Sequence, residues 1–158
     1  MIIFSNTTPL FAFAALGQFD LLHHVHGTLH VTREVARECS VGGPITVPSL
    51  AALSWIQLVP GPLAPDPRFF MLDAGERATL SAALQANADL VLIDERLARN
   101  LAEYHGLHVV GTLGTLLKAK QTGLIPAFLP PVRHLQQAGF WYHEPLIARL
   151  AALVGECP

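Results

Sequence analysis

One short segment near the middle of the chain restricts the fold more than any other. Residues 88–93 form a largely apolar run that is followed at once by Asp94. Residues 73–86, before it, are rich in Ala, Leu and Glu, and residues 94–105, after it, end at Gly106 and are also helix-forming. An apolar run too short for a helix, placed between two helices, is typical of a buried central strand. The sequence therefore predicts a strand flanked by helices.

The same alternation extends along the rest of the chain. The segments that predict strands are residues 1–5, 29–31, 55–59, 88–93 and 107–110. Helices are expected at residues 9–16, 19–24, 32–39, 49–53, 73–86, 94–105, 112–122, 131–138 and 144–154. Alternation favours parallel pairing with right-handed crossovers, and strands that are apolar on both faces favour a sheet covered on both sides. We expect an α/β fold with a short, mainly parallel central sheet, in one domain spanning residues 1–158.

Composition and charge narrow the functional classes. The chain is 51% hydrophobic, which argues against disorder, and its formal net charge of −2 provides no general basic surface for nucleic acid. An RNA contact would depend on a local cluster of arginines and a metal ion. Cys39 and Cys157 follow no metal-binding spacing, which predicts a reduced, cytoplasmic chain. We expect no signal peptide and no membrane contact, because no apolar run reaches the roughly 18–20 residues that a membrane helix needs.

Polar side chains follow the predicted strands where a parallel sheet binds its ligands. Asn6 comes after the first strand and Asp94 after the central one, so both point to the crevice beyond the carboxyl ends of the strands. Glu38 lies near the end of the helix that follows the second strand, and Asp73 and Glu76 open the helix before the central strand. Clustered oxygen ligands suit a hard divalent cation such as Mg²⁺ or Mn²⁺. Such a site predicts phosphodiester hydrolysis.

Each of these acids also has a purely structural interpretation. Asp73 and Glu76 have the spacing of a capping box, and without the other segments that interpretation is the better one. Asp94 would be only the N-cap of the next helix. Glu34 and Glu38 are four residues apart and would share a solvated helix face. The order and combination of the acids favour a site.

Other polar and aromatic residues carry weaker predictions. Arg96 and Arg99 would reach a phosphate with their forked guanidinium groups, although a surface ion pair on the helix is the preferred interpretation. Thr7 and Thr112 would hydrogen-bond ligands or substrate, and they serve equally well as caps. The aromatic run at 140–142 would pack under the last helix or face a partner.

Five motifs in chain order carry a resemblance to a known family. They are Ser5-Asn6-Thr7-Thr8-Pro9-Leu10, Val35-Ala36-Arg37-Glu38, Leu72-Asp73-Ala74-Gly75-Glu76, Val91-Leu92-Ile93-Asp94-Glu95-Arg96 with Arg99, and Gly111-Thr112-Leu113-Gly114. Together they resemble the PIN-domain family up to about residue 155, closest to an uncharacterised branch related to VapC-like toxin ribonucleases. The resemblance implies a compact α/β/α sandwich and a Mg²⁺- or Mn²⁺-dependent endoribonuclease acting on RNA. It also implies a homodimer and, for a toxin, a protein antitoxin.

By position, the resemblance implies that Glu38, Glu76 and Asp94 are catalytic. It implies that the metal ligands are these three residues together with Asn6 and Asp73. Many active members carry aspartate where this chain has Asn6. The amide still offers a carbonyl oxygen but brings no negative charge, so lower metal affinity is expected.

Two alternative functions follow from these observations. The first is a catalytically silent PIN-like module that binds RNA or a protein partner, which Asn6 and the acidic charge balance favour. The second is a phosphate-handling enzyme of receiver-like or phosphatase fold. Asn6 argues against it, because a phosphoacceptor aspartate would be expected after the first strand.

Overall fold

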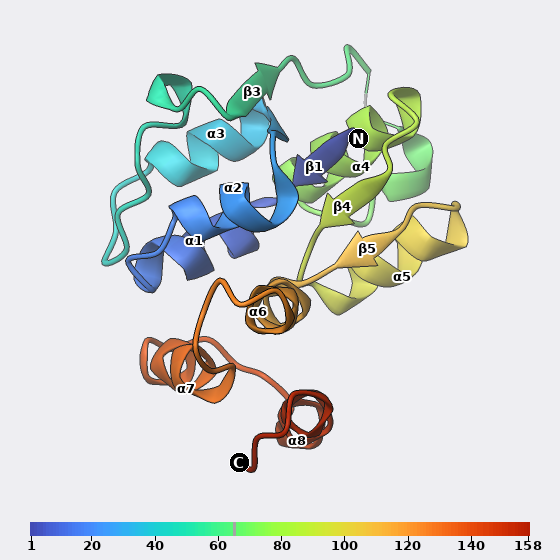
Figure 1. Cartoon of the computed structure of the whole chain (residues 1–158). Coiled ribbons are helices and arrows are strands. Elements are labelled where there is room, and N and C mark those ends of the chain that lie inside the picture. The colour runs from blue at the N-terminus through green and yellow to red at the C-terminus, as the bar shows by residue number, and fades with distance from the viewer. Residues whose placement is uncertain (65) are drawn as a thin grey trace.

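The fold is organised around a parallel sheet of five short strands (Figure 1). A computed structural model describes residues 1–64 and 66–158. The strands lie in the order β3-β2-β1-β4-β5, and every pair is parallel. Their bounds are β1 Ile3–Ser5, β2 Leu29–Thr32, β3 Ile56–Val59, β4 Leu90–Leu92 and β5 Val109–Val110. The predicted α/β class is confirmed; four strands are one to three residues shorter than the runs that predicted them, and β2 is one residue longer.

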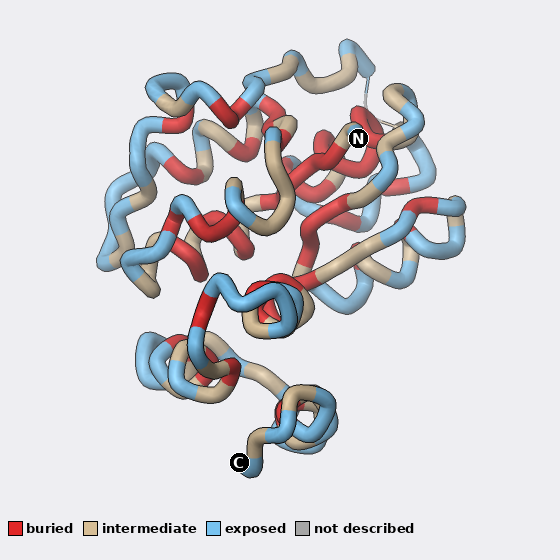
Figure 2. Tube along the Cα trace, viewed as in Figure 1, coloured by how far each residue is buried: buried red, intermediate tan, exposed pale blue. Residues whose placement is uncertain are grey.

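Helices cover both faces of the sheet. The helices of the described residues are α1 Thr7–Ala15, α2 Asp20–His26, α3 Arg33–Ser40, α4 Ala74–Gln85, α5 Arg96–Tyr104, α6 Thr112–Gln121, α7 Leu129–Gln137 and α8 Glu144–Leu153, and α1 to α6 form the two layers. In the strands, neighbouring side chains enter different apolar clusters: Ile3 joins the cluster of α1, α2, α3 and α6, and Phe4 joins that of α4 and α5. This alternation confirms the three-layer α/β/α sandwich, and the buried positions in Figure 2 run through the sheet between the helical layers.

The strand order reverses between β1 and β4. Ser5 pairs with Leu92 in register, and β2 lies on the opposite side of β1. Connections that leave β1 and β4 therefore pass to opposite faces of the sheet, which opens a crevice at the carboxyl ends of these two strands. Asn6 follows β1 directly, and its backbone N–H donates to the carbonyl of Leu92 at 2.9 Å. The crevice is where the sequence predicts the site.

Local sequence signals explain where several helices begin. Thr32 is the N-cap of α3 and accepts a hydrogen bond from the Val35 N–H, as predicted. A short 3₁₀ turn at Leu50–Ala52 replaces the predicted helix at 49–53. The proline-rich connection predicted over residues 60–67 is a loop at residues 60–64 and 66, and Pro65 lies outside the described residues. A 3₁₀ turn that the sequence did not predict follows at Pro67–Phe69, capped by the Asp66 side chain.

The last two helices pack beyond α6, away from the sheet (Figure 1). The N-terminus of α7 is closed by a residue near the end of the chain, because Glu156 accepts from the N–H groups of Phe128 at 2.7 Å and Leu129 at 3.0 Å. Ile147 and Ala151 of α8 are fully buried against the same cluster as α6. In the described part of the chain, no helix has the length and apolar character to cross a membrane.

Candidate functional site at the carboxyl edge of the sheet

Asn6 is buried at the strand crevice with one polar atom left without a partner. Its exposed fraction is 3%, and its Oδ1 makes no hydrogen bond to any described residue. Asn6 is the N-cap of α1, yet its side chain does not cap the helix. A buried carbonyl oxygen without a partner costs about 1–3 kcal/mol, so it is normally retained only where something satisfies it. An Oδ1 in this state fits a cation ligand.

Glu38 reaches the same edge from α3. The hydroxyl of Thr7, next to Asn6, donates to Oε2 of Glu38. On its other side the carboxylate lies against Gly75, where an added Cβ would stand 2.8 Å from Cδ of Glu38. The first turn of α4 can therefore approach Glu38 because residue 75 has no side chain. This contact explains the glycine that precedes Glu76 in the sequence motif.

Asp73 and Glu76 form the capping box that their spacing predicts. Asp73 Oδ1 accepts from the Glu76 N–H at 2.9 Å, and Glu76 Oε2 accepts from the Asp73 N–H at 3.3 Å. Glu76 is 8% exposed. Burial, followed by the nearby charge of Asp73, raises the pKa of Glu76 to about 7; smaller contributions come from the charges of Glu95 and Glu38, and the Asp73 N–H acts in the opposite sense.

Asp94 is held at the start of α6. Its carboxylate accepts from the N–H of Thr112 at 2.7 Å and from the Thr112 hydroxyl at 2.6 Å. Burial raises the pKa of Asp94, while these two bonds and the charge of Arg99 act in the opposite sense. Gly111 makes room for it, because a Cβ there would lie 2.6 Å from Oδ1 of Asp94. The interpretation of Asp94 as the N-cap of α5 is wrong: Glu95 holds that position.

Glu95 is an acidic residue that the sequence prediction did not include. It follows Asp94 and is exposed, and its charge acts on Glu76 together with that of Glu38. The acids that share an electrostatic environment therefore come from α3, from the start of α4 and from the β4–α5 junction. The sequence does show this second acid directly after the central strand. Its position alone does not distinguish a site residue from a solvated helix residue.

The predicted substrate-binding residues lie around these acids. The hydroxyls of Thr7 and Thr112 are both occupied by carboxylates, those of Glu38 and Asp94. Arg99 donates from a guanidinium N–H to the carbonyl of Ile93 at 2.9 Å, and Arg96 is exposed at the start of α5. The surface ion pair expected for these arginines is wrong, because neither forms one with any residue in 1–64 or 66–158.

The oxygen donors fit a hard divalent cation in chemistry, although they do not form a closed ligand shell. Asn6 contributes an unpaired carbonyl oxygen, and Glu38 and Glu76 contribute carboxylates whose mutual repulsion a cation would relieve. Within the described residues, no three His, Cys, Asp or Glu side chains converge closely enough to hold one ion. An ion would require these carboxylates to move closer together.

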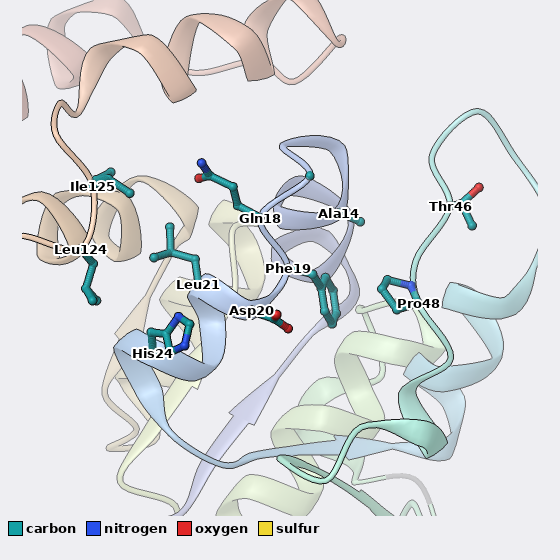
Figure 3. A pocket seen from close by; sticks show the side chains of 11 residues that line it. Ala14, Gln18, Phe19, Asp20, Leu21, His24, Thr46, Pro48, Leu124 and Ile125 are labelled. Atoms are coloured by element: carbon teal, nitrogen blue, oxygen red, sulfur yellow. The ribbon is translucent and has the colours of Figure 1, made fainter.

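Two of the clefts have no lining residue in common. One, of about 750 Å³, is bordered by Asp94, Glu95 and Arg96 and so adjoins the acidic site. The other, of about 510 Å³, lies between α1, α2 and the start of the α6–α7 connection, with Asp20 and His24 among its lining residues (Figure 3). It contains none of the predicted site residues, whereas Asp94, Arg96 and Arg99 line the first cleft.

Comparison with known proteins gives one match. The family model DUF3368, described as a PIN domain, matches residues 2–156. Neither a curated protein nor a solved structure matches the chain significantly.

Proposed function

The chain belongs to the PIN-domain family, and from this membership and the acidic crevice we propose that it is a metal-dependent endoribonuclease. Proteins with this domain are generally nucleases that use divalent metal ions. The observation that carries the proposal is that Glu38, Glu76 and Glu95, from three separate elements, share an electrostatic environment at the edge of the sheet where the Oδ1 of Asn6 is unpaired. Glu38 is half-buried and Glu76 is buried, and burial of acids near like charges costs stability, which is typical of a functional site.

The ion would be Mg²⁺ or Mn²⁺, and Asn6, Glu38 and Glu76 would hold it. Asp94 and Asp73 also belong to the proposed ligand set. Asp94 is held by Thr112, the first residue of α6, and Asp73 is the N-cap of α4. A bound ion supplies charge neutralisation at the scissile phosphate and a more acidic water. Thr7 orients Glu38 through its hydroxyl, and this bond fixes the carboxylate before any ion arrives.

The residues themselves also contribute to hydrolysis. In the metal-free protein the pKa of Glu76 is about 7, so a bound cation would displace the proton and hold Glu76 as a carboxylate ligand. Arg96 and Arg99 border the cleft next to Glu95 and would hold the phosphate through forked hydrogen bonds. Thr112 keeps Asp94 in place.

Cleavage of a mixed RNA pool in Mn²⁺ tests the proposal. Wild type should cleave, Glu76→Gln should not, and Asn6→Asp should cleave at lower Mn²⁺ concentration because an added charge raises metal affinity. Glu103→Gln, an exposed acid at the far end of α5, is the matched control and should cleave as wild type does. Wild type that leaves the pool intact, or Glu76→Gln that retains full activity, would overturn the proposal.

A silent PIN-like module that binds RNA or a protein partner is the second candidate. The neutral Asn6 and the open arrangement of the acids favour it. It predicts RNA binding without cleavage at every Mn²⁺ concentration, and no gain of activity in Asn6→Asp.

The proposal extends to assembly and setting. We propose a homodimer, a cytoplasmic location for a chain with two free cysteines, and, for a toxin role, a protein antitoxin as partner. Sedimentation equilibrium of the purified chain tests the dimer, since a monomer at every concentration would exclude it.

A further inference from the structure

The larger cleft is built from two unlike walls. One group of lining residues comes from the β4–α5 junction, the start of α5 and β5; the other comes from residues 139–143 and α8. Leu113 and Gly114 of α6 also line the cleft, and Figure 1 shows α8 beyond α6. A volume of about 750 Å³ is within the usual range for sites that accept organic ligands. The cleft is therefore large enough for part of a polymer chain.

One end of the cleft meets the proposed cleavage site. Asp94 and Glu95 both line it, and the charge of Glu95 acts on Glu76. A ligand that lies along the cleft therefore reaches the acidic crevice without leaving the surface. The lining does not include Asn6, Glu38 or Glu76, so an occupant of the cleft lies next to the proposed metal ligands and not on them.

The wall next to the acids carries cations suited to phosphate. Arg96 is exposed, and it makes no ion pair or side-chain hydrogen bond with the described residues. Arg99 lies one turn further along α5 and uses one N–H on the Ile93 carbonyl, which leaves other donors of its guanidinium for a ligand. Both side chains border the cleft, so an anionic backbone has partners there.

The opposite wall presents an aromatic face to solvent. Trp141 is 81% exposed, and the His143 ring lies 6.2 Å from it at 44°. The residues next to Trp141 are anchored, because Phe140 and Tyr142 are half-buried and pack against the main apolar cluster. An indole held on an anchored segment and left uncovered is a platform for stacking, and stacking on aromatic side chains is how unpaired nucleic acid bases are bound without sequence readout.

We propose that this cleft binds single-stranded RNA next to the scissile phosphate, with an unpaired base on Trp141 and an adjoining phosphate on Arg96. This inference rests on the proposed nuclease function and names the form of its substrate. A duplex is excluded from the subsite, because its bases already stack on one another and present no free face to the indole. The cations and the aromatic ring together favour RNA over a protein segment, which would need no phosphate partners.

Binding measured without cleavage separates this subsite from the catalytic proposal. The probe is a fluorescent single-stranded oligouridylate of 12 nucleotides, in chelator so that no metal is present. Trp141→Ala should weaken binding by about 10- to 100-fold, as expected when one base loses its stacking partner, and Trp141→Phe should restore most of it. Tyr104→Ala removes an aromatic residue that is 84% exposed at the other end of α5 and should bind as wild type does.

Each further outcome decides the proposal. Arg96→Gln should weaken binding and reduce its dependence on salt concentration, and a blunt duplex of equal length should bind less tightly than the single strand. Equal binding by wild type and Trp141→Ala overturns the subsite. If wild type does not cleave RNA but its binding still depends on Trp141, the nuclease proposal is overturned and the subsite stands.

Discussion

Thr112 donates two hydrogen bonds to Asp94, one from its backbone N–H at 2.7 Å and one from its hydroxyl at 2.6 Å. The pair joins the end of the β4 segment to the start of α6. A carboxylate at a helix N-terminus is stabilised both by the N–H groups and by the helix dipole. Asp94 is therefore fixed in position before any ligand binds.

Removal of the Thr112 hydroxyl should destabilise the fold. Thr112→Val keeps the shape of the side chain but deletes a donor to a charged group, which is expected to cost about 1.5–3 kcal/mol of unfolding free energy. Urea denaturation followed by circular dichroism measures it. Thr112→Ser retains the hydroxyl and should lose much less, so equal losses in the two variants would contradict the importance of this bond.

Replacement of Gly75 should damage the site more than the fold. A Cβ at residue 75 would stand 2.8 Å from Cδ of Glu38 and displace that carboxylate, while alanine is the better helix former by about 1 kcal/mol. Gly75→Ala should therefore unfold near the wild-type denaturant concentration but bind Mn²⁺ at least about tenfold more weakly. Gly43→Ala, where a Cβ meets nothing within 4 Å, is the control. Unchanged Mn²⁺ affinity in Gly75→Ala would contradict the assignment of Glu38.

The unfolding free energy of the metal-free protein should change with pH because Glu76 titrates. Burial raises the pKa of Glu76 to about 7, above the ordinary value of 4.5 that applies in the unfolded chain, so the folded state binds the extra proton. The resulting stability is fully present below pH 4.5 and is lost as the pH rises through 7, by about 3 kcal/mol. The difference in unfolding free energy between wild type and Glu76→Gln, measured in chelator from pH 4.5 to 8, reports this change. A difference that stays constant with pH would show that Glu76 titrates normally.

The end of the chain should stabilise α7. Glu156 accepts from the N–H groups of Phe128 and Leu129, so it acts as an N-cap from 27 or more residues away in sequence. Glu156→Ala should lower the unfolding free energy by about 1–2 kcal/mol, the usual cost of a lost cap. The matched control is Glu144→Ala, which removes an exposed ion pair with Arg133 and should cost less. A larger loss of unfolding free energy in Glu144→Ala than in Glu156→Ala would contradict the capping role of Glu156.

The fold was largely accessible from the sequence because its signals are local. Apolar runs of three to six residues between helix-forming segments mark the strands, and Thr32 and Asp73 mark the starts of α3 and α4 with their own side chains. The 3₁₀ turn at Pro67–Phe69 was missed, since it lies in a proline-rich connection whose pattern predicts only a loop. The helix bounds differ from those expected by only a few residues.

The site was accessible only in part, because side-chain direction depends on contacts between distant segments. The position of Asp94 after β4 predicts that it lies at the crevice, but not that Thr112, 18 residues later, would bind both of its oxygens. Glu95 was left out for the same reason. The contact between Gly75 and Glu38 joins two helices, and no spacing in the sequence reports it.

A calorimetric titration with Mn²⁺ tests the central claim most directly, because it measures the ion at the acidic crevice without depending on a chosen RNA. The account predicts saturable binding by wild type, at least tenfold weaker binding by Glu38→Gln, and wild-type binding by the remote control Glu103→Gln, as expected when one charged ligand is removed. Absence of binding by wild type at millimolar Mn²⁺, or equal binding by Glu38→Gln, would contradict the claim that these residues form a metal site.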